Sequence, residues 1–374
     1  MSKPKIVIVT STRADYGKLK SIILKLQSNK KFKVDLFVTG QHNLKLYGNT
    51  IIEIRKDKIK NLYVFKNQTR YSSTNEILSN TIKGFTTYLI KNMPSLVIIH
   101  GDRIEPLACA ISSILMNYKV AHIEGGEVSG TVDEIIRHSI SKLSHLHFVS
   151  NKLAKKRLLQ MGEESRSIHV VGSPDVDIIL NKKLPKLSYT KQRYDINFQN
   201  YAISLFHPVT TSLNTFKKNI KIYFNSLVKS KKNFIMPYPN NDIGSEFIMK
   251  EIKKLKNNKN FKFLPSFRFE YFLTLLKNSE LIIGNSSSGI MEAPYYGIQT
   301  INLGNRQKNR LTAPSILNLD FNERNIINNI LKTYGKKYKK KKYFGFGNSD
   351  KKVSKLIESN VYLKIDQQKT FVDR

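Results

Sequence analysis

Four carboxylate side chains gather near the predicted ends of apolar strands in the first half of the chain. Asp102 follows one apolar run, Glu124 and Glu127 follow the next, and Asp133 begins a helical pattern shortly afterwards. Crowded or desolvated carboxyl groups have raised pKa values, and such groups can move a proton to and from carbon. The pattern therefore predicts acid–base chemistry. For each residue alone a structural role stays open, because Asp133 stands at i,i+4 from Arg137 and could simply pair with it.

A serine-rich turn marks the second half of the chain. Residues 284–289 read Gly-Asn-Ser-Ser-Ser-Gly, between an apolar run and a helical pattern. Backbone N–H groups, hydroxyls and the start of a helix can hold a phosphate, but the same residues also make an ordinary helix cap. Glu292, one turn further on, could reach a ribose diol or lie on the surface. The turn has no following lysine of the P-loop kind, so a P-loop is excluded.

Two further segments place polar residues after predicted strands. Residues 12–17 (Thr-Arg-Ala-Asp-Tyr-Gly) stand where a dinucleotide fold has its glycine fingerprint, which is absent here. Arg13 offers a cation at this edge, and Asp15 a carboxylate or a helix cap. His207 closes the first predicted strand of the second half, as a site residue or a structural histidine. His138 and His145, seven residues apart, could share a helix face and be buried.

The polar residues are spaced by an alternation of short β-branched runs and helical patterns, which predicts parallel sheets covered by helices. The alternation weakens between about residues 174 and 200 and then restarts, so we expect two doubly wound α/β units that face a cleft. The expected divisions are 1–185, 195–350 and a C-terminal helix or tail at 351–374. The expected strands are 5–10, 34–38, 96–100, 120–123, 147–149 and 169–171 in the first unit, and 201–206, 233–236, 262–264, 281–283 and 300–302 in the second.

Composition narrows the class of protein further. Cys109 is the single cysteine, and the eight histidines show no paired metal-binding spacing, so we expect neither a disulfide nor a metal site. No export signal or membrane span is visible, and a cytoplasmic protein without a membrane partner is expected. The net charge is +35. It raises the alternative of a nucleic-acid binder, but the lysines are spread along the chain and fit solvated positions better.

Several of these segments, taken in order, resemble the UDP-N-acetylglucosamine 2-epimerase family, and in particular its hydrolysing branch, which feeds sialic acid synthesis. The resemblance runs from Lys5 to about Arg310. The matching segments are 12–16, 100–103, 122–131, 136–138, 207–211, 284–289 and 302–307. Glu124 is followed by Gly-Gly-Glu, as in the hydrolysing branch.

The resemblance implies a GT-B-like pair of Rossmann-like domains, with UDP held mainly by the second. Catalytic roles would fall to Asp102, Glu124 and Asp133, and less firmly to His145. UDP contacts would come from the following residues: Arg13, His207, Ser286, Ser287 and Glu292, with Arg103 and Arg306 as further candidates. No cofactor and no metal are implied. Relatives suggest a homodimer or homotetramer.

The implied reaction converts UDP-N-acetylglucosamine and water to N-acetylmannosamine and UDP. A carboxylate removes the C2 proton as UDP leaves C1, and water adds to the resulting glycal. Asp102 or Glu124 would be the base and Asp133 a partner in protonation or water activation. Two alternatives stay open: the same chemistry on UDP-N,N′-diacetylbacillosamine, on the way to legionaminic acid, and a GT-B glycosyltransferase.

Overall fold

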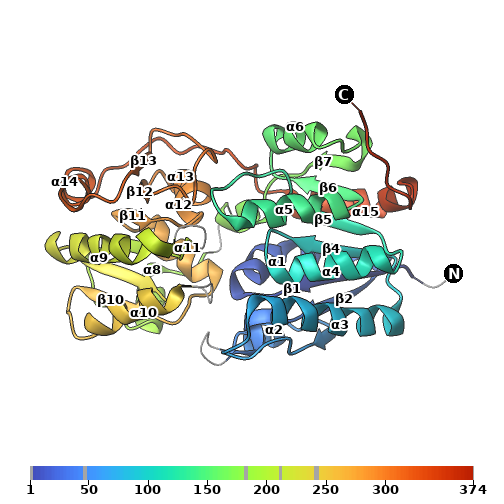
Figure 1. The fold of residues 1–374 in the computed structure, drawn as a ribbon, viewed down its shortest axis with the longest axis horizontal. Coiled ribbons are helices and arrows are strands. Elements are labelled where there is room, and N and C mark those ends of the chain that lie inside the picture. The colour runs from blue at the N-terminus through green and yellow to red at the C-terminus, as the bar shows by residue number, and fades with distance from the viewer. Residues whose placement is uncertain (1–2, 45–48, 181–183, 210–212, 240–243, 374) are drawn as a thin grey trace. The chain divides into compact units, whose positions relative to one another are not determined.

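The fold consists of two compact units, each built around one parallel sheet (Figure 1). The computed structural model describes residues 3–44, 49–180, 184–209, 213–239 and 244–373. Unit 1 comprises Met1–Glu127, Asp133–Asn181 and Phe344–Arg374, and unit 2 comprises Val128–Val132 and Lys182–Tyr343. The chain thus returns to unit 1 at Phe344, whereas the sequence pattern placed a boundary at 350.

Unit 1 has a seven-stranded parallel sheet in the order β3-β2-β1-β4-β5-β6-β7. Its strands are β1 Lys5–Thr10, β2 Lys33–Val38, β3 Asn61–Val64, β4 Leu96–His100, β5 Val120–Ile123, β6 Leu146–Val149 and β7 Ile168–Val170. Its helices are α1 Arg13–Ser28, α2 Ile51–Lys56, α3 Thr74–Asn92, α4 Ile104–Leu115, α5 Val132–Leu143, α6 Lys152–Gln160, α7 Pro174–Ile179 and α15 Ser349–Glu358. The strand order reverses at β1 and β4, where ligands bind in folds of this kind.

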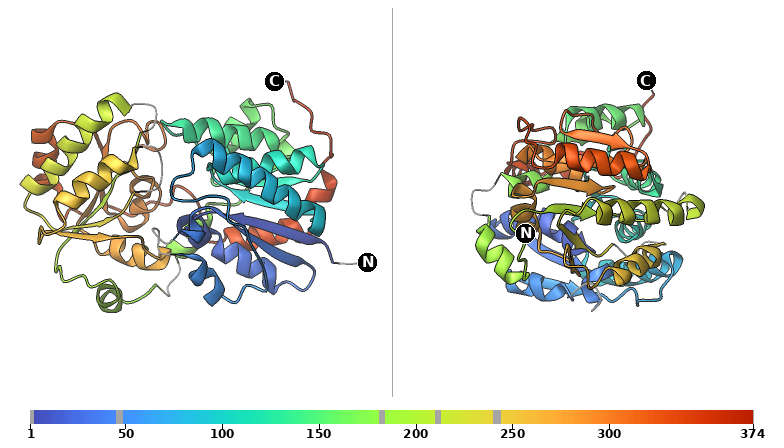
Figure 2. Two further views of the ribbon diagram at one scale, coloured as in Figure 1. Left: turned by 60° about the horizontal axis from the view of Figure 1, so that its bottom comes forward. Right: turned by 90° about the vertical axis from the view of Figure 1, so that its left-hand side faces the viewer.

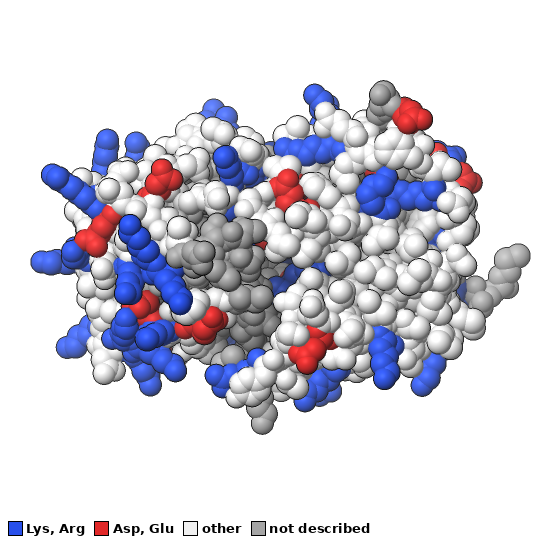
Figure 3. All heavy atoms as spheres, in the orientation of Figure 1, with Lys and Arg blue, Asp and Glu red and all other residues white. Residues whose placement is uncertain are grey.

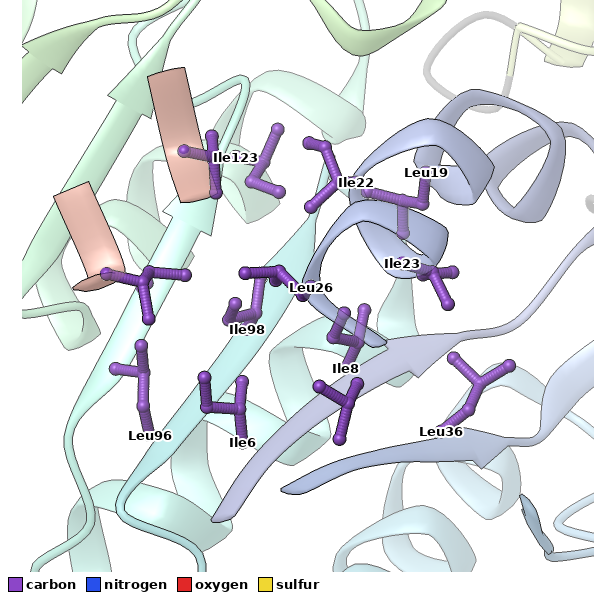
Figure 4. Packing of buried hydrophobic residues seen from close by; sticks show 14 of the residues in the cluster. Ile6, Ile8, Leu19, Ile22, Ile23, Leu26, Leu36, Leu96, Ile98 and Ile123 are labelled. Atoms are coloured by element: carbon purple, nitrogen blue, oxygen red, sulfur yellow. The ribbon is translucent and has the colours of Figure 1, made fainter. Parts of the chain in front are cut away.

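Alternating side chains of the unit 1 strands form two cores, one on each face of the sheet. Ile6 and Ile8 of β1 point to the face covered by α1 and α15. Figure 4 shows them packed with Leu19, Ile22 and Leu26 of α1. The residues between them, such as Val7, join the core under α3 and α4. Figure 2 shows the red C-terminal helix α15 among the elements of unit 1, far in sequence from its neighbours.

Unit 2 repeats the architecture with a six-stranded parallel sheet in the order β10-β9-β8-β11-β12-β13. Its strands are β8 Ala202–Leu205, β9 Phe234–Pro237, β10 Phe261–Leu264, β11 Leu281–Gly284, β12 Gln299–Leu303 and β13 Ile316–Leu319. Its helices are α8 Leu187–Arg193, α9 Leu213–Lys229, α10 Ser245–Lys254, α11 Phe269–Lys277, α12 Ser288–Met291, α13 Ala293–Tyr296 and α14 Glu323–Thr333.

The predicted pair of doubly wound α/β units is confirmed, with two differences in detail. The edge strands β3 and β13 did not stand out in the sequence, because they are only partly buried and lack a clear apolar run. The helical pattern that follows the serine-rich turn forms two short helices, which meet at Glu292. Pro294 explains the break, since proline has no N–H to continue the first helix but is suited to the first turn of a new one.

Candidate active site

Asp102 and Glu124 follow neighbouring strands at the carboxyl edge of the unit 1 sheet. In the β4–β5 pair His100 lies opposite Ile123, so both strands end at the same level. The predicted proximity of the two carboxylates follows from this register, because parallel strands present their carboxyl ends at one edge. The structure therefore brings together two of the four residues predicted to be catalytic.

Glu124 is buried and held on both carboxylate oxygens. His100 Nε2 lies 3.0 Å from Oε2, and the Ser173 hydroxyl donates to Oε1. Burial alone would raise the pKa of Glu124, but Lys18, His100 and Ser173 outweigh it and hold the pKa well below its usual range. Glu124 also has a φ of 64°, a backbone conformation that is costly for a residue other than glycine. Strain of this kind persists where the surrounding structure imposes it, and functional sites are common examples.

His100 forms the other half of this pair. Burial lowers its pKa, but the charge and the hydrogen bond of Glu124 outweigh burial and raise the pKa above its usual value. The contact with ionised Glu124 therefore favours the protonated form of His100, and both side chains are removed from water. An ionised carboxylate is the form that can accept a proton from a substrate.

Asp102 is held by Arg137, a residue of α5 that is almost completely buried. Arg137 Nη2 pairs with Asp102 Oδ2, and Nη1 donates to the Glu127 carbonyl at 2.9 Å. Burial lowers the pKa of Arg137, but Asp102, Glu127 and Asp133 outweigh it and raise the pKa. The sequence suggested Asp133 and Arg137 as a local pair. In the structure Arg137 also fixes the partly exposed Asp102 from a helix thirty-five positions away in sequence.

The loop that carries Asp102 is positioned by His122. The Nε2 atom of His122 lies 2.7 Å from the Gly101 carbonyl, and Nδ1 lies 3.0 Å from the Ser141 hydroxyl. Burial lowers the pKa of His122 to about 3, so the ring is neutral at neutral pH. A neutral ring has one N–H, which the carbonyl fixes on Nε2, and Nδ1 then accepts from Ser141. His122 therefore orients the backbone next to Asp102.

Arg13 and Arg103 are both half-buried and begin or precede helices at this same edge. Arg13 is the first residue of α1, and Arg103 caps α4 and donates through Nε to Glu105 at 3.4 Å. Asp15 is a helix cap rather than a site residue, because its carboxylate accepts from Ser11 and Thr12 in a capping box. The capping alternative for Asp15 was therefore correct.

His145 does not join the carboxylates, and the expectation of a shared site was wrong. It precedes β6, at the amino edge of the parallel sheet, opposite to the edge where Asp102 and Glu124 lie. It also lies beyond the end of α5, so it shares no helix face with His138. His145 Nδ1 accepts from the Val120 N–H, and Nε2 lies 3.1 Å from the Gln367 carbonyl. These two contacts tie the C-terminal segment to the sheet, which is a structural role.

Glu163 anchors the same C-terminal segment, and replacing it tests this structural role. Its buried carboxylate contacts His147 at 2.9 Å, Lys142 at 2.9 Å and Lys369 at 2.6 Å. Burial raises its pKa, but His147 and Lys369 outweigh this and lower the pKa to about 2. The stability that Glu163 contributes is therefore complete above its ordinary pKa of 4.5 and is lost as the pH falls toward 2.

We expect Glu163→Gln to lower the Tm by roughly 5 °C at pH 7, and the difference from the unmodified protein to shrink below pH 4.5. Differential scanning calorimetry at several pH values measures both effects. A Tm difference that stays constant from pH 7 to pH 3 would contradict the ionic role.

In unit 2, Asn285 organises the predicted phosphate-binding turn. Its side chain accepts from the His207 N–H and donates to the His207 carbonyl, both at 2.8 Å, and so joins the loops after β8 and β11. Its own carbonyl accepts from Arg306 at 3.2 Å and Gln307 at 3.1 Å. Three loops that carry predicted UDP contacts are therefore joined by hydrogen bonds to one buried residue, Asn285.

The predicted UDP-binding residues of unit 2 gather around this amide. Ser286 and Ser287 are half-buried just before the four-residue helix α12, and the Ser286 hydroxyl accepts from the Ser288 N–H. Glu292 follows α12 and is buried, so it is not the surface glutamate that the sequence left open. Arg306 and His207 lie on the neighbouring loops. Thr210 and Thr211 of the 207–211 motif lie outside the described residues.

The family of the chain follows from comparison with known proteins. Residues 24–358 match the family model described as UDP-N-acetylglucosamine 2-epimerase. The chain belongs to this family. It is therefore an enzyme, and the predicted resemblance is confirmed.

Relatives in the 2-epimerase family match almost the whole chain. It is 42% identical over 373 residues to the UDP-N-acetylglucosamine 2-epimerase of Neisseria meningitidis serogroup B, covering 99% of both chains. It is 32% identical over 360 residues to the UDP-N,N′-diacetylbacillosamine 2-epimerase (hydrolyzing) of Legionella pneumophila, covering 95% of this chain and 96% of the relative. A solved UDP-GlcNAc 2-epimerase from Neisseria meningitidis, bound to UDP-GlcNAc, shares the fold with a TM-score of 0.81 at 22% identity, over 95% of this chain and all of that one.

The residues that hold the predicted site residues in place were not predicted from the sequence of this epimerase. His100 and Ser173 hold Glu124, and Asn285 holds the predicted UDP-binding turn, yet none of the three was predicted to have this role. His100 lies in a segment that matches the family, which was the available signal. No sequence signal pointed to the Ser173 side chain, which is 49 positions from Glu124.

Among the described residues no group of three His, Cys, Asp or Glu side chains could hold a metal ion. In the described part of the chain no helix is long and apolar enough to cross a membrane.

Gly284 leaves no space for a side chain at the start of the serine-rich turn, and the variant Gly284→Ala tests this close packing. Its φ is +138°, and a Cβ atom there would lie 1.9 Å from the Leu205 carbonyl oxygen, which belongs to the backbone of β8. We expect Gly284→Ala to lower the free energy of unfolding by about 3 kcal/mol, since both the conformation and the space exclude a side chain.

Urea denaturation measures this loss, and Gly335→Ala is the matched control in the same unit. Gly335 has a φ of +80°, but its Cβ would meet only the end of the flexible Glu280 side chain at 3.2 Å. We expect the control to cost about 1 kcal/mol. Equal losses in the two variants would show that the contact with Leu205 has no effect.

Proposed function

We propose that the enzyme hydrolyses UDP-N-acetylglucosamine with inversion at C2 and releases UDP and N-acetylmannosamine. The observation that carries the proposal is 42% identity over nearly the full length to a relative named UDP-N-acetylglucosamine 2-epimerase. The 32% identical relative, whose name specifies a hydrolysing 2-epimerase, supports hydrolysis. The buried Glu124 and the Arg137-paired Asp102 supply the carboxylates that the reaction requires.

In the first step a carboxylate takes the proton from C2, the bond between C1 and the UDP oxygen breaks, and a C1–C2 double bond forms. We assign the proton to Glu124 or Asp102, both of which are held in ion pairs. In the second step a proton returns to C2 from the opposite face and the hydroxyl of water adds to C1. Asp133, one helical turn before Arg137, is the proposed partner in protonation or water activation.

The departing diphosphate gains charge as the C1–O bond breaks, and fixed donors can stabilise that charge. We assign the diphosphate to Ser286, Ser287 and Arg306, and the ribose hydroxyls to Glu292. The joining of their loops through Asn285 supports this assignment, because donors that are already in place need no reorganisation when the charge develops. His207, Arg13 and Arg103 are the further proposed contacts with UDP.

The deciding experiment is incubation with UDP-N-acetylglucosamine in deuterated water, followed by NMR identification of the free sugar. We expect N-acetylmannosamine with deuterium at C2, together with an equal amount of UDP. UDP release only from UDP-N,N′-diacetylbacillosamine would favour the substrate of the 32% identical relative instead. Free UDP-N-acetylmannosamine, without UDP release, would show epimerisation without hydrolysis. Turnover only with an added acceptor would indicate a glycosyltransferase.

We further propose that the enzyme acts in the cytoplasm as a homodimer or homotetramer. Exposed apolar side chains on α3, after it and on α4 support an oligomer: Ile90, Met93 and Leu115 are 62%, 71% and 76% exposed. Figure 3 shows few charged side chains over α4, whereas Lys and Arg are dense over α9 and α10 of unit 2. An apolar face with few charged side chains is unusual on a chain with a net charge of +35 and is typical of an interface.

Leu115→Glu is expected to weaken self-association at least about tenfold, because a buried charge at an interface is strongly unfavourable. Light scattering after size-exclusion chromatography, over a dilution series, measures the change. Leu331→Glu is the control, since Leu331 is 51% exposed on α14 of unit 2. An oligomer that withstands Leu115→Glu and dissociates with Leu331→Glu would place the interface elsewhere.

A further inference from the structure

A single buried hydroxyl lies between Glu124 and a second carboxylate. Ser173 immediately precedes α7 and is completely buried. Its backbone is fixed by a hydrogen bond from its N–H to the Phe344 carbonyl at 2.7 Å. Its Oγ atom lies within hydrogen-bonding distance of Glu124 Oε1 and of Asp175 Oδ1. The hydroxyl therefore contacts two acceptors on opposite carboxylates.

Each carboxylate has a cation on its other oxygen. Lys18 Nζ lies 3.1 Å from Asp175 Oδ2, and His100 Nε2 lies 3.0 Å from Glu124 Oε2. The five side chains form one row, in the order Lys18, Asp175, Ser173, Glu124, His100. With His100 protonated the row carries two positive and two negative charges. The charged groups around Glu124 and His100 come from several elements: Lys18 and Asp15 from α1, His100 from β4 and Asp175 from α7.

A serine hydroxyl has one proton and two acceptor lone pairs. Ser173 can therefore donate to only one of the two carboxylates at a time. When Glu124 is ionised, the hydroxyl can donate to it. When Glu124 has taken a proton, its new O–H can donate to Ser173 Oγ, and the Ser173 proton turns to Asp175. Both states keep a hydrogen bond to Glu124 Oε1, so the carboxyl group need not rotate as it gains and loses its proton.

We propose that Ser173 and Asp175 are positioning residues for Glu124: Ser173 holds its carboxyl group in one orientation in both protonation states, and Asp175 keeps that hydroxyl from acting as a donor to Glu124 alone. The proposal rests on the proposed function, in which Glu124 exchanges a proton with the sugar. Asp175 also balances the charge of Lys18, which otherwise stabilises the ionised form of Glu124. Both effects of Asp175 preserve the affinity of Glu124 for a proton.

The two residues therefore act on Glu124 in opposite directions, which a purely structural role would not produce. Ser173→Ala removes the hydroxyl that orients the ionised carboxylate of Glu124, so we expect kcat to fall roughly 30-fold at pH 7. Asp175→Asn leaves Ser173 donating to Glu124 alone. We expect kcat to fall roughly tenfold, because Glu124 then has a lower affinity for the proton that it must accept. The KM is expected to stay within about twofold in both variants, because neither residue is assigned to substrate binding.

Two further variants separate positioning from packing. Ser173→Cys keeps the size of the side chain but has a weak donor, so it is expected to behave like Ser173→Ala in kcat and like the unmodified enzyme in Tm. The double variant Ser173→Ala, Asp175→Asn is expected to lose less activity than the product of the two single losses, because the two residues share the contact with Glu124. Losses that multiply in the double variant would overturn the proposal.

Asp177→Asn is the matched control. Asp177 lies on the same helix α7, two residues from Asp175, but it accepts from Ser349 and Asp350 at the start of α15. We expect this variant to lose stability and to keep kcat. The proposal is overturned if Ser173→Ala and Asp175→Asn keep kcat within twofold, or if Asp177→Asn lowers kcat as much as they do.

Titration of the Glu124 carboxyl group, followed by infrared spectroscopy without substrate, tests the proposal independently of any turnover. The carboxyl signal of Glu124 is identified by its absence in Glu124→Gln. Its midpoint is expected to rise by about one pH unit or more in Ser173→Ala and not to rise in Asp175→Asn. If the unmodified enzyme turns over neither UDP-sugar, the proposed function is wrong. The titration still decides whether Ser173 and Asp175 control Glu124, and an unchanged midpoint in Ser173→Ala would overturn that control.

Discussion

Replacement of Glu124 by glutamine is expected to lower kcat by roughly 1,000-fold, with little change in KM. General acid–base groups contribute about 100- to 10,000-fold, and an amide cannot accept a proton from C2. The amide keeps the shape of the side chain and a carbonyl oxygen that can accept from Ser173 or His100. The measurement is UDP release in a coupled assay over a range of substrate concentrations, with Tm recorded for each variant.

Glu164→Gln is the control for this prediction, because Glu164 also lies in unit 1 but on its surface, paired with Arg166. We expect it to retain the kcat of the unmodified enzyme. If Glu124→Gln loses less than tenfold in kcat, Glu124 does not exchange the C2 proton. The assignment of the proton then passes to Asp102.

Asp102→Asn is the second prediction with a large effect, and it differs by combining loss of activity with loss of stability. We expect kcat to fall roughly 100- to 1,000-fold, since the carboxylate beside the predicted reaction centre becomes neutral. The variant also removes a negative partner of the buried Arg137, which keeps its hydrogen bond to the Glu127 carbonyl and the nearby charge of Asp133. Loss of one partner of a buried ion pair costs about 3 kcal/mol or more, so the Tm should fall by several degrees.

Asp366→Asn is the matched control, because Asp366 is a surface residue of unit 1 that pairs with Arg166. It should change neither kcat nor Tm. Calorimetry and the UDP-release assay on the same samples separate the two effects of Asp102→Asn. A variant with normal kcat and reduced Tm would show that Asp102 is only the structural partner of Arg137.

The alternation of apolar runs predicted most of the parallel strands, because a strand buried on both faces is almost continuously apolar. The runs that became β1, β4 and β11 are examples. The edge strands β3 and β13 were not found in this way, since they are only partly buried and their apolar pattern is weak, whereas the edge strands β7 and β10 were expected. The return of the chain to unit 1 at Phe344 was equally hidden, because it depends on the packing of α15 against α1 and α7.

The sequence by itself determined the family, the two doubly wound units and the placement of Asp102 and Glu124 at one sheet edge. Motif order and strand ends are local properties, and parallel strands bring their carboxyl ends together whatever the rest of the chain does. Tertiary structure alone decided which groups hold those carboxylates. His145 matched the family less firmly than Asp102 did and lies at the amino edge. Ser173 lies in none of the matching segments, yet it contacts Glu124. Contacts between residues far apart in sequence depend on helix packing and loop direction, which residue spacing does not specify.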